Sequence, residues 1–418
     1  MQAPADILDS GSLSNRMEDA RMIADYQAAG SNIDELIYLS LGETWADTPP
    51  GLVAALADIP NHANGYQLTP YGLPALRNVL REYIIRTHDL DDVTPGWFDV
   101  SVSQCGTRSA MADFGQFIRS CTPKRRVALV PEPGWDYPGV LAPLGFSVRT
   151  YPLTQRQDWQ PDTEAVEEMI RTSPDTGLLV LNPQHNPTGS DWTPSVVARL
   201  LDLAEERGVA VLLDDAYYAV HTPGTAPTNA LRILLSERRT QPWLAVRTLG
   251  KQFRCNGWGL GALTGRPETL GILAAIAHRR YYGSAVPLQA AMASWLADPE
   301  SDRYIEQLGD HYVRTRDQVH SRLVGDLGFP DHAVSPGTCT SYLRFQVPPS
   351  FAADHDEDAY RRLCLAAGVL PGRGSMTAPS RHGGNDDRSS WVRIHLGHPP
   401  QVLDDAFDRL LATGLGWK

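Results

Sequence analysis

Lysine is almost absent from this chain of 418 residues. Lys and Arg together number 37, yet the only lysines are Lys124, Lys251 and Lys418. Unlike a guanidinium, a lysine amine readily loses its proton when desolvated or placed beside other cations, and it can then attack a carbonyl carbon. Lys124 precedes two arginines in a polar turn and Lys418 is the last residue, so we expect both to be solvated charges. Lys251 lies among glycines after an apolar run, where it is either a reactive amine or an ordinary lysine at the end of a strand.

Cysteines and long apolar runs are also scarce. The cysteines are odd in number, scattered and without a C-x-x-C pair, which excludes a disulfide framework and predicts no zinc or other metal site. No apolar run approaches the roughly 18 residues that cross a bilayer, and the N-terminus lacks the pattern of a signal peptide. We therefore expect a cytoplasmic protein without membrane contact.

The charge balance and the length narrow the class of protein further. A formal net charge of -12 disfavours nonspecific binding to nucleic acid. The length, with 42% apolar and 21% charged residues, is that of a globular protein with one large domain and a smaller one.

Short apolar runs alternate with helical patterns through the middle of the chain. Buried strands that alternate with helices indicate an α/β architecture, here a mostly parallel seven-stranded sheet between helices. The runs lie at 98–102, 127–130, 146–151, 178–181, 209–213, 243–246 and 260–263, and helical patterns lie at 163–171 and 194–207.

The two ends of the chain have a different pattern. A helix at 12–29, a strand at 36–41 and a helix at 74–88 are expected before the alternation. After Pro287 we expect an α+β domain with helices at 302–323, 357–367 and 401–413, strands at 341–347 and 391–396, and a polar loop at 380–390. The predicted organisation is an N-terminal arm that contributes to the small domain (1–50), a large domain (51–300) and a C-terminal small domain (301–418).

Polar residues follow several of the predicted strands. Ligands of open α/β sheets bind beyond the carboxyl ends of the strands, so these residues are site candidates. The turn 104–110 opens a helix after the first run, and its free N–H groups suit a phosphate. Asn186-Pro187-Thr188-Gly189 follows the run at 178–181. Asp214 follows the run at 209–213, and a buried acid is costly unless it meets a cation.

Three motifs follow one another along the chain in an order and spacing that resemble a known family. Asn186-Pro187-Thr188-Gly189, Asp214-x-x-Tyr217 and Lys251 together resemble the pyridoxal-phosphate-dependent aminotransferases of class I and II, which have fold type I. Each motif alone is modest, but the match covers nearly the whole chain. The resemblance implies pyridoxal 5'-phosphate as cofactor, an amino acid substrate with a keto acid co-substrate, and a homodimer with shared active sites.

The resemblance also implies roles for single residues. Lys251 would hold the cofactor as a Schiff base and move the substrate α-proton, with Asp214 on the pyridine nitrogen and Tyr217 on the ring oxygen. Arg393 would clamp the substrate carboxylate, and Gly42 would close over the substrate. The remaining cofactor-binding candidates are Asn186 at the ring oxygen, Trp135 stacked on the ring, Gly106, Thr107 and Thr248 around the phosphate, and Tyr66 reaching the neighbouring subunit's phosphate.

One position departs from the family pattern. The family usually has an arginine for the cofactor phosphate where this chain has Gly259, in Gly257-Trp258-Gly259-Leu260-Gly261. A buried phosphate dianion needs another cation, and we favour Arg108 in the phosphate-type turn over Arg254, Arg279 and Arg280.

The departure keeps three functions open. The first is an aminotransferase. The second is a fold type I enzyme of specialised metabolism that does not transaminate, such as an oxidase, a cyclase or an enzyme of β- or γ-replacement. The third is a ligand sensor without catalysis, although no N-terminal extension long enough for a winged helix is present.

Overall fold

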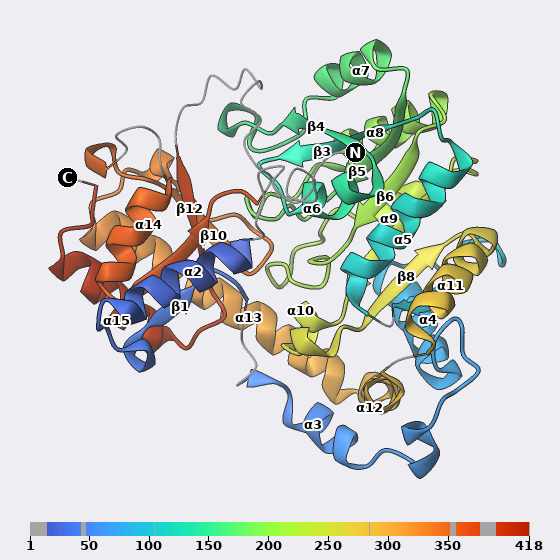
Figure 1. Cartoon of the computed structure of the whole chain (residues 1–418), viewed down its shortest axis with the longest axis horizontal. Coiled ribbons are helices and arrows are strands. Elements are labelled where there is room, and N and C mark those ends of the chain that lie inside the picture. The colour runs from blue at the N-terminus through green and yellow to red at the C-terminus, as the bar shows by residue number, and fades with distance from the viewer. Residues whose placement is uncertain are drawn as a thin grey trace.

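The computed structural model describes residues 15–42, 47–103, 105–283, 285–351, 357–376 and 390–417. The described chain forms two sheets, each covered by helices, and Figure 1 shows them as the two halves of the molecule. No described helix is both long and apolar enough to cross a membrane.

The larger sheet has seven strands in the order β2-β8-β7-β6-β5-β3-β4. Only β8 runs antiparallel to its neighbours, β2 and β7, so the sheet is mostly parallel as predicted. Its central strands are mostly apolar and buried almost along their whole length, as expected for a parallel sheet with helices on both faces. The strands are β2 (Asp99–Ser103), β3 (Val127–Glu132), β4 (Ser147–Pro152), β5 (Thr176–Leu181), β6 (Ala210–Asp214), β7 (Trp243–Thr248) and β8 (Gly261–Gly265).

Helices of this half begin where local signals favour them. In α7 (Thr163–Thr172), the Asp162 side chain caps the first turn by accepting from the backbone N–H groups of Glu164 and Ala165. The apolar residues Val166 and Ile170 of α7 then pack into the core. The other helices are α3 (Pro50–Ala57), α4 (Pro74–Thr87), α5 (Gly106–Cys121), α6 (Tyr137–Leu141), α8 (Pro194–Glu206), α9 (Ala230–Leu235), α10 (Gly250–Phe253), α11 (Pro267–Tyr281) and α12 (Val286–Ala297).

The smaller sheet joins the two ends of the chain. Its order is β1-β11-β12-β10-β9, and β1 pairs in parallel with β11. Helix α13 leads from the larger half into this one (Figure 1). The strands are β1 (Ile37–Leu39), β9 (Val334–Ser335), β10 (Tyr342–Gln346), β11 (Val369–Arg373) and β12 (Trp391–His395), and the helices are α2 (Asn15–Ala28), α13 (Glu300–Ser321), α14 (Glu357–Ala366) and α15 (Pro400–Ala412).

The seven predicted strands of the larger sheet are confirmed to within two residues. So are the predicted helices of the small domain, including α13, which ends at Ser321 and is followed by a wider helical turn over Arg322–Asp326. The first residues of the helix expected at 12–29 and most of the loop expected at 380–390 lie outside the described residues. The domain boundaries stay a prediction.

Candidate active site

The carboxyl ends of neighbouring strands bring the predicted residues to one edge of the larger sheet. Asp214 is the last residue of β6, and Lys251 lies in α10, directly after β7. Asn186 follows β5, and its backbone N–H donates to Asn182 Oδ1 at 2.9 Å. Because the carboxyl ends of parallel strands lie at the same edge of the sheet, these residues lie side by side.

Asp214 is a buried acid with one side-chain donor. Tyr137 Oη donates to its Oδ2 at 2.8 Å, and the backbone N–H of Ala216 donates to its Oδ1 at 3.3 Å. Burial raises the pKa of Asp214 to about 6, although the Tyr137 hydrogen bond and the charge of Lys251 act to lower it. A cation placed against this carboxylate would favour its ionised form.

The Lys251 amine lies under the N-terminal segment. A β-carbon built on Gly42 would lie 3.3 Å from Lys251 Nζ and 2.9 Å from His395 Nε2. The Gly42 carbonyl accepts a hydrogen bond from Asn256 Nδ2 at 2.6 Å. Only glycine fits here without displacing His395, so the segment closes tightly over the lysine.

Arg393, from strand β12 of the smaller sheet, lies beside Asn186 of the predicted site. It is 1% exposed, its guanidinium lies 4.4 Å from the centre of the Tyr342 ring, and its Nη1 donates to Asn186 Oδ1 at 3.4 Å. Within the described chain, Arg393 Nε is buried without a hydrogen-bond partner, and the buried Tyr217 and Ser341 hydroxyls lie next to each other. Buried polar atoms rarely stay unpaired, so these groups are suited to a ligand.

The phosphate-type turn is confirmed as a helix start, with a difference at its first residue. Gly106 begins α5 with φ +80, and its N–H already donates to the Gly259 carbonyl at 2.5 Å. The N–H groups of the next residues, from Thr107 on, have no carbonyl four residues earlier in the helix. Thr248, at the end of β7, pairs with Gly261 in β8, and a β-carbon on Gly261 would touch the Thr107 side chain.

Gly259 leaves no simple place for the family's arginine. Its φ is +63, a conformation that residues with side chains rarely adopt, and a β-carbon there would lie 3.4 Å from Gly106 N. Gly259 therefore lets its own turn contact the backbone at Gly106, in the place where the family pattern has an arginine side chain.

Three of the four arginines considered as substitutes have side-chain partners in the structure. Arg108 donates to Asp136 at 2.9 Å, and its guanidinium lies 4.3 Å from the centre of the Trp135 ring. Arg254 pairs with Asp47 at 2.6 Å, and Arg280 pairs with Asp113. The structure therefore brings Arg108 together with Trp135, while Arg254 and Arg280 are engaged elsewhere.

Tyr66 lies outside this cluster within one chain. It is 82% exposed and meets Tyr282 edge to face at 5.3 Å between ring centres, while neighbouring Leu68 is 95% exposed. Such exposed aromatic and apolar groups are typical of surfaces that contact another protein.

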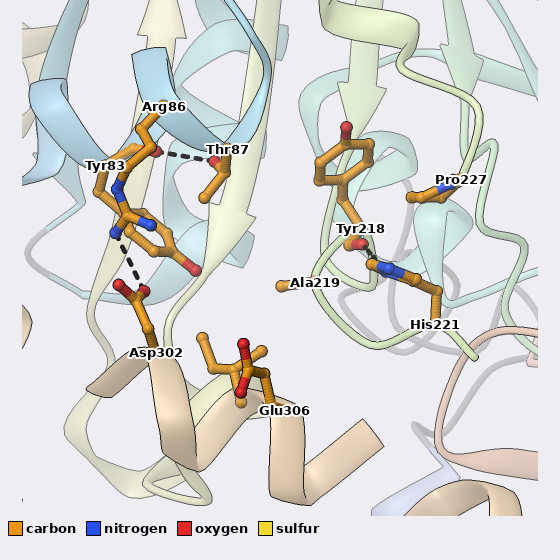
Figure 2. A pocket seen from close by; sticks show the side chains of 10 residues that line it. Tyr83, Arg86, Thr87, Tyr218, Ala219, His221, Pro227, Asp302 and Glu306 are labelled. Atoms are coloured by element: carbon orange, nitrogen blue, oxygen red, sulfur yellow. Dashed lines mark hydrogen bonds and ion pairs between the residues drawn. The ribbon is translucent and has the colours of Figure 1, made fainter. Parts of the chain in front are cut away.

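A cavity of about 430 Å³ lies elsewhere, between α4, the segment after β6, and α13. Figure 2 shows Arg86 and Asp302 on one side of it, where they form an ion pair of 3.0 Å, and Tyr218 and His221 on the other side. None of the predicted site residues lines it, so the site is defined by the cluster around Lys251.

The family model described as aminotransferase class I and II matches residues 34–410. The chain belongs to this family. As a family member it is an aminotransferase-type enzyme, and the family uses pyridoxal phosphate.

Similar proteins agree with this assignment. The LL-diaminopimelate aminotransferase of Desulforudis audaxviator is 26% identical over 395 residues, which cover 93% of this chain and 92% of that protein. The aspartate/prephenate aminotransferase of Thermus thermophilus is 28% identical over 342 residues, covering 81% and 83%. These names favour transamination over the other fold type I chemistries.

Solved structures confirm the fold. The Thermus thermophilus aspartate aminotransferase with maleate superposes with a TM-score of 0.80 at 23% identity, covering 99% of this chain and 100% of that one. Apo-BacF of Bacillus subtilis gives a TM-score of 0.83 at 21% identity, with both chains fully covered.

Sequence reasoning missed several residues that shape the candidate site. Tyr137 and Asn182 hold Asp214 through its carboxylate and its carbonyl, and Asn256 holds Gly42. His395 was also missed, although strand alternation after Arg393 places it on the same face of β12.

Proposed function

We propose that this enzyme transfers the amino group of an amino acid to a keto acid, with pyridoxal 5'-phosphate bound at Lys251. The observation that carries the proposal is that Lys251 and Gly42, from distant parts of the chain, meet beside His395, which lies two residues after Arg393 in β12. A lysine amine beside an arginine fork suits a substrate that carries both an amine and a carboxylate.

The residues present fit the cofactor. Asp214 is a buried carboxylate whose ionised form needs a cation, which the protonated pyridine nitrogen would supply, and the Tyr217 hydroxyl is buried nearby. Asn186 and Tyr217 would hold the ring oxygen, Trp135 would lie on the ring, and Gly106, Thr107, Arg108 and Thr248 would surround the phosphate. The cofactor, when bound, supplies an electron sink for the bond broken at the substrate α-carbon.

The chain's own groups would do the remaining work. Lys251 Nζ would take the substrate α-proton and return it, because an amine that loses its proton in a desolvated site can act as base and acid in turn. Arg393 would bind the α-carboxylate through two parallel N–H groups, which fixes the direction of the α-carbon. Gly42 would cover this region and exclude water.

We further propose a homodimer in which Tyr66 reaches the phosphate site of the other subunit. This proposal is supported by the exposure of Tyr66, Leu68 and Tyr282. An isologous interface would then complete both sites at once. The five cysteines are free, which supports a cytoplasmic location.

The deciding experiment is a substrate panel. Purified enzyme loaded with pyridoxal phosphate is mixed with single amino acids, including aspartate and LL-diaminopimelate, with and without 2-oxoglutarate. We expect the cofactor absorbance to change with the right amino acid and to recover when a keto acid is added. A spectrum that changes with amino acids but never recovers with keto acids would contradict transamination.

A further inference from the structure

His395 is a buried histidine that faces the candidate site. It follows Arg393 by two positions in β12, so the two side chains share one face of the strand. It is 2% exposed and its ring lies edge-on to the Tyr342 ring, at 5.3 Å between centres. The ring is therefore held firmly in place.

A hydrogen bond fixes the tautomer of His395. The backbone N–H of Gly397 donates to its Nδ1 at 3.2 Å, so Nδ1 is the acceptor and the proton of the neutral ring is on Nε2. Burial, followed by the charges of His398, Lys251, Arg254 and Arg393, holds the pKa of His395 well below its usual value. His395 thus presents an uncharged N–H donor.

The donor points to the place where Lys251 and Gly42 meet. His395 Nε2 and Lys251 Nζ both lie within 3.3 Å of the β-carbon position of Gly42. The charged groups that act most strongly on the ring are all basic. An N–H donor among cations favours an anionic, acceptor-only ligand.

We propose that His395 is a substrate-binding residue that donates its Nε2–H to the α-carboxylate of the amino acid, beside Arg393. This inference rests on the proposed function. Because Lys251 must reach the substrate α-carbon, a donor next to its amine is within reach of the carboxylate bonded to that carbon. A carboxylate further along a substrate side chain would lie away from the amine.

The test compares two variants of the holoenzyme. Gln can place an N–H donor near the position of Nε2, whereas Leu fills similar space without one. We expect His395→Leu to raise the KM for the amino acid and the Kd of propanoate about tenfold, which is the loss of one hydrogen bond to a charged group. His395→Gln should stay within about threefold of the wild type for both. The kcat should change little, because the α-carboxylate is bound equally before and during the reaction.

His398→Leu is the matched control, because His398 Nε2 is already bonded to the Tyr38 carbonyl at 2.9 Å. It should leave propanoate binding unchanged. An independent readout is the ¹⁵N histidine spectrum of the wild type, which should show His395 as the Nε2–H tautomer, with that proton shifting when propanoate is added. This spectrum decides the matter if His395→Leu does not fold.

Two results would overturn the inference. One is an unchanged propanoate affinity in His395→Leu, measured beside a wild type that binds propanoate and turns over amino acids. This result would exclude the role of His395 but would not contradict the proposed function. The other is an Nδ1–H tautomer. If the wild type itself turns over no amino acid, the proposed function fails first, and this inference fails with it.

Discussion

Replacing Asp214 by Asn should stabilise the apoprotein at neutral and basic pH. The folded-state pKa of Asp214 is raised from 3.8 to about 6, mainly by burial, so the native state binds this proton more tightly than the unfolded state. Native stability is therefore lost as pH rises from about 4 through 6, by about 3 kcal/mol in all. Asn is uncharged, has nearly the same shape, and still accepts from Tyr137.

The urea unfolding of both apoproteins measures this difference. We expect Asp214→Asn to exceed the wild type by about 3 kcal/mol at pH 8 and by about half of that at pH 5. It should also bind pyridoxal phosphate more weakly, because the carboxylate that would meet the pyridine nitrogen is gone. A variant that is less stable than the wild type at pH 8, or a difference that does not depend on pH, would refute the reasoning.

Asp215→Asn is a control for which we expect the opposite change in the stability of the apoprotein. It follows Asp214 directly, but it forms a buried ion pair with Arg247 at 2.8 Å and contacts His88 at 3.0 Å. Burial alone would raise the pKa of Asp215, yet Arg247 and His88 outweigh it and lower the pKa. Asp215→Asn should therefore destabilise the apoprotein by about 3 to 5 kcal/mol at pH 8, because the Arg247 charge stays buried without its partner.

Three further predictions concern the cofactor site. Arg108→Ala should raise the Kd of pyridoxal phosphate in equilibrium dialysis at least roughly tenfold, about 1.4 kcal/mol. Arg254→Ala should change this Kd little, because Arg254 pairs with Asp47. Unchanged binding in Arg108→Ala would mean that another group offsets the phosphate charge. Gly259→Arg should weaken cofactor binding, since the left-handed φ is unfavourable for any residue with a side chain, and Gly259→Ala should do the same. Tighter binding by the arginine variant would contradict this. Mixing the inactive variants Lys251→Ala and Tyr66→Ala should restore about a quarter of the wild-type activity, because half of the random dimers are mixed and each has one intact site; no recovery would mean that Tyr66 serves its own subunit or none.

The regular parts of the fold were predictable because their signals are local. Each buried strand of the larger sheet is a short apolar run, and helices such as α8 begin at a proline with helical spacing behind it. β11 was missed since Val369–Arg373 contains a proline and a glycine, which argue against a strand. Its parallel pairing with β1 joins residues from opposite ends of the chain, and no local pattern encodes such a contact.

The candidate site was predictable only in part. The sequence places Asp214 and Lys251 at the ends of neighbouring strands, so their proximity follows from the sheet. Tyr137 and His395 are different, because their places depend on how α6 packs on β6 and how the smaller sheet meets the larger one. The surroundings of Arg108 also depend on side-chain packing, here on Trp135 and Asp136.

The most direct test of the account is to find which amine holds the cofactor. The holoenzyme is reduced with borohydride, digested with trypsin and analysed by mass spectrometry. Because trypsin does not cleave after a modified lysine, cofactor on Lys251 should yield the intact peptide 248–254 with the added mass, and Lys251→Ala should carry none. Cofactor recovered on Lys124 or Lys418, or turnover by Lys251→Ala, would contradict the account.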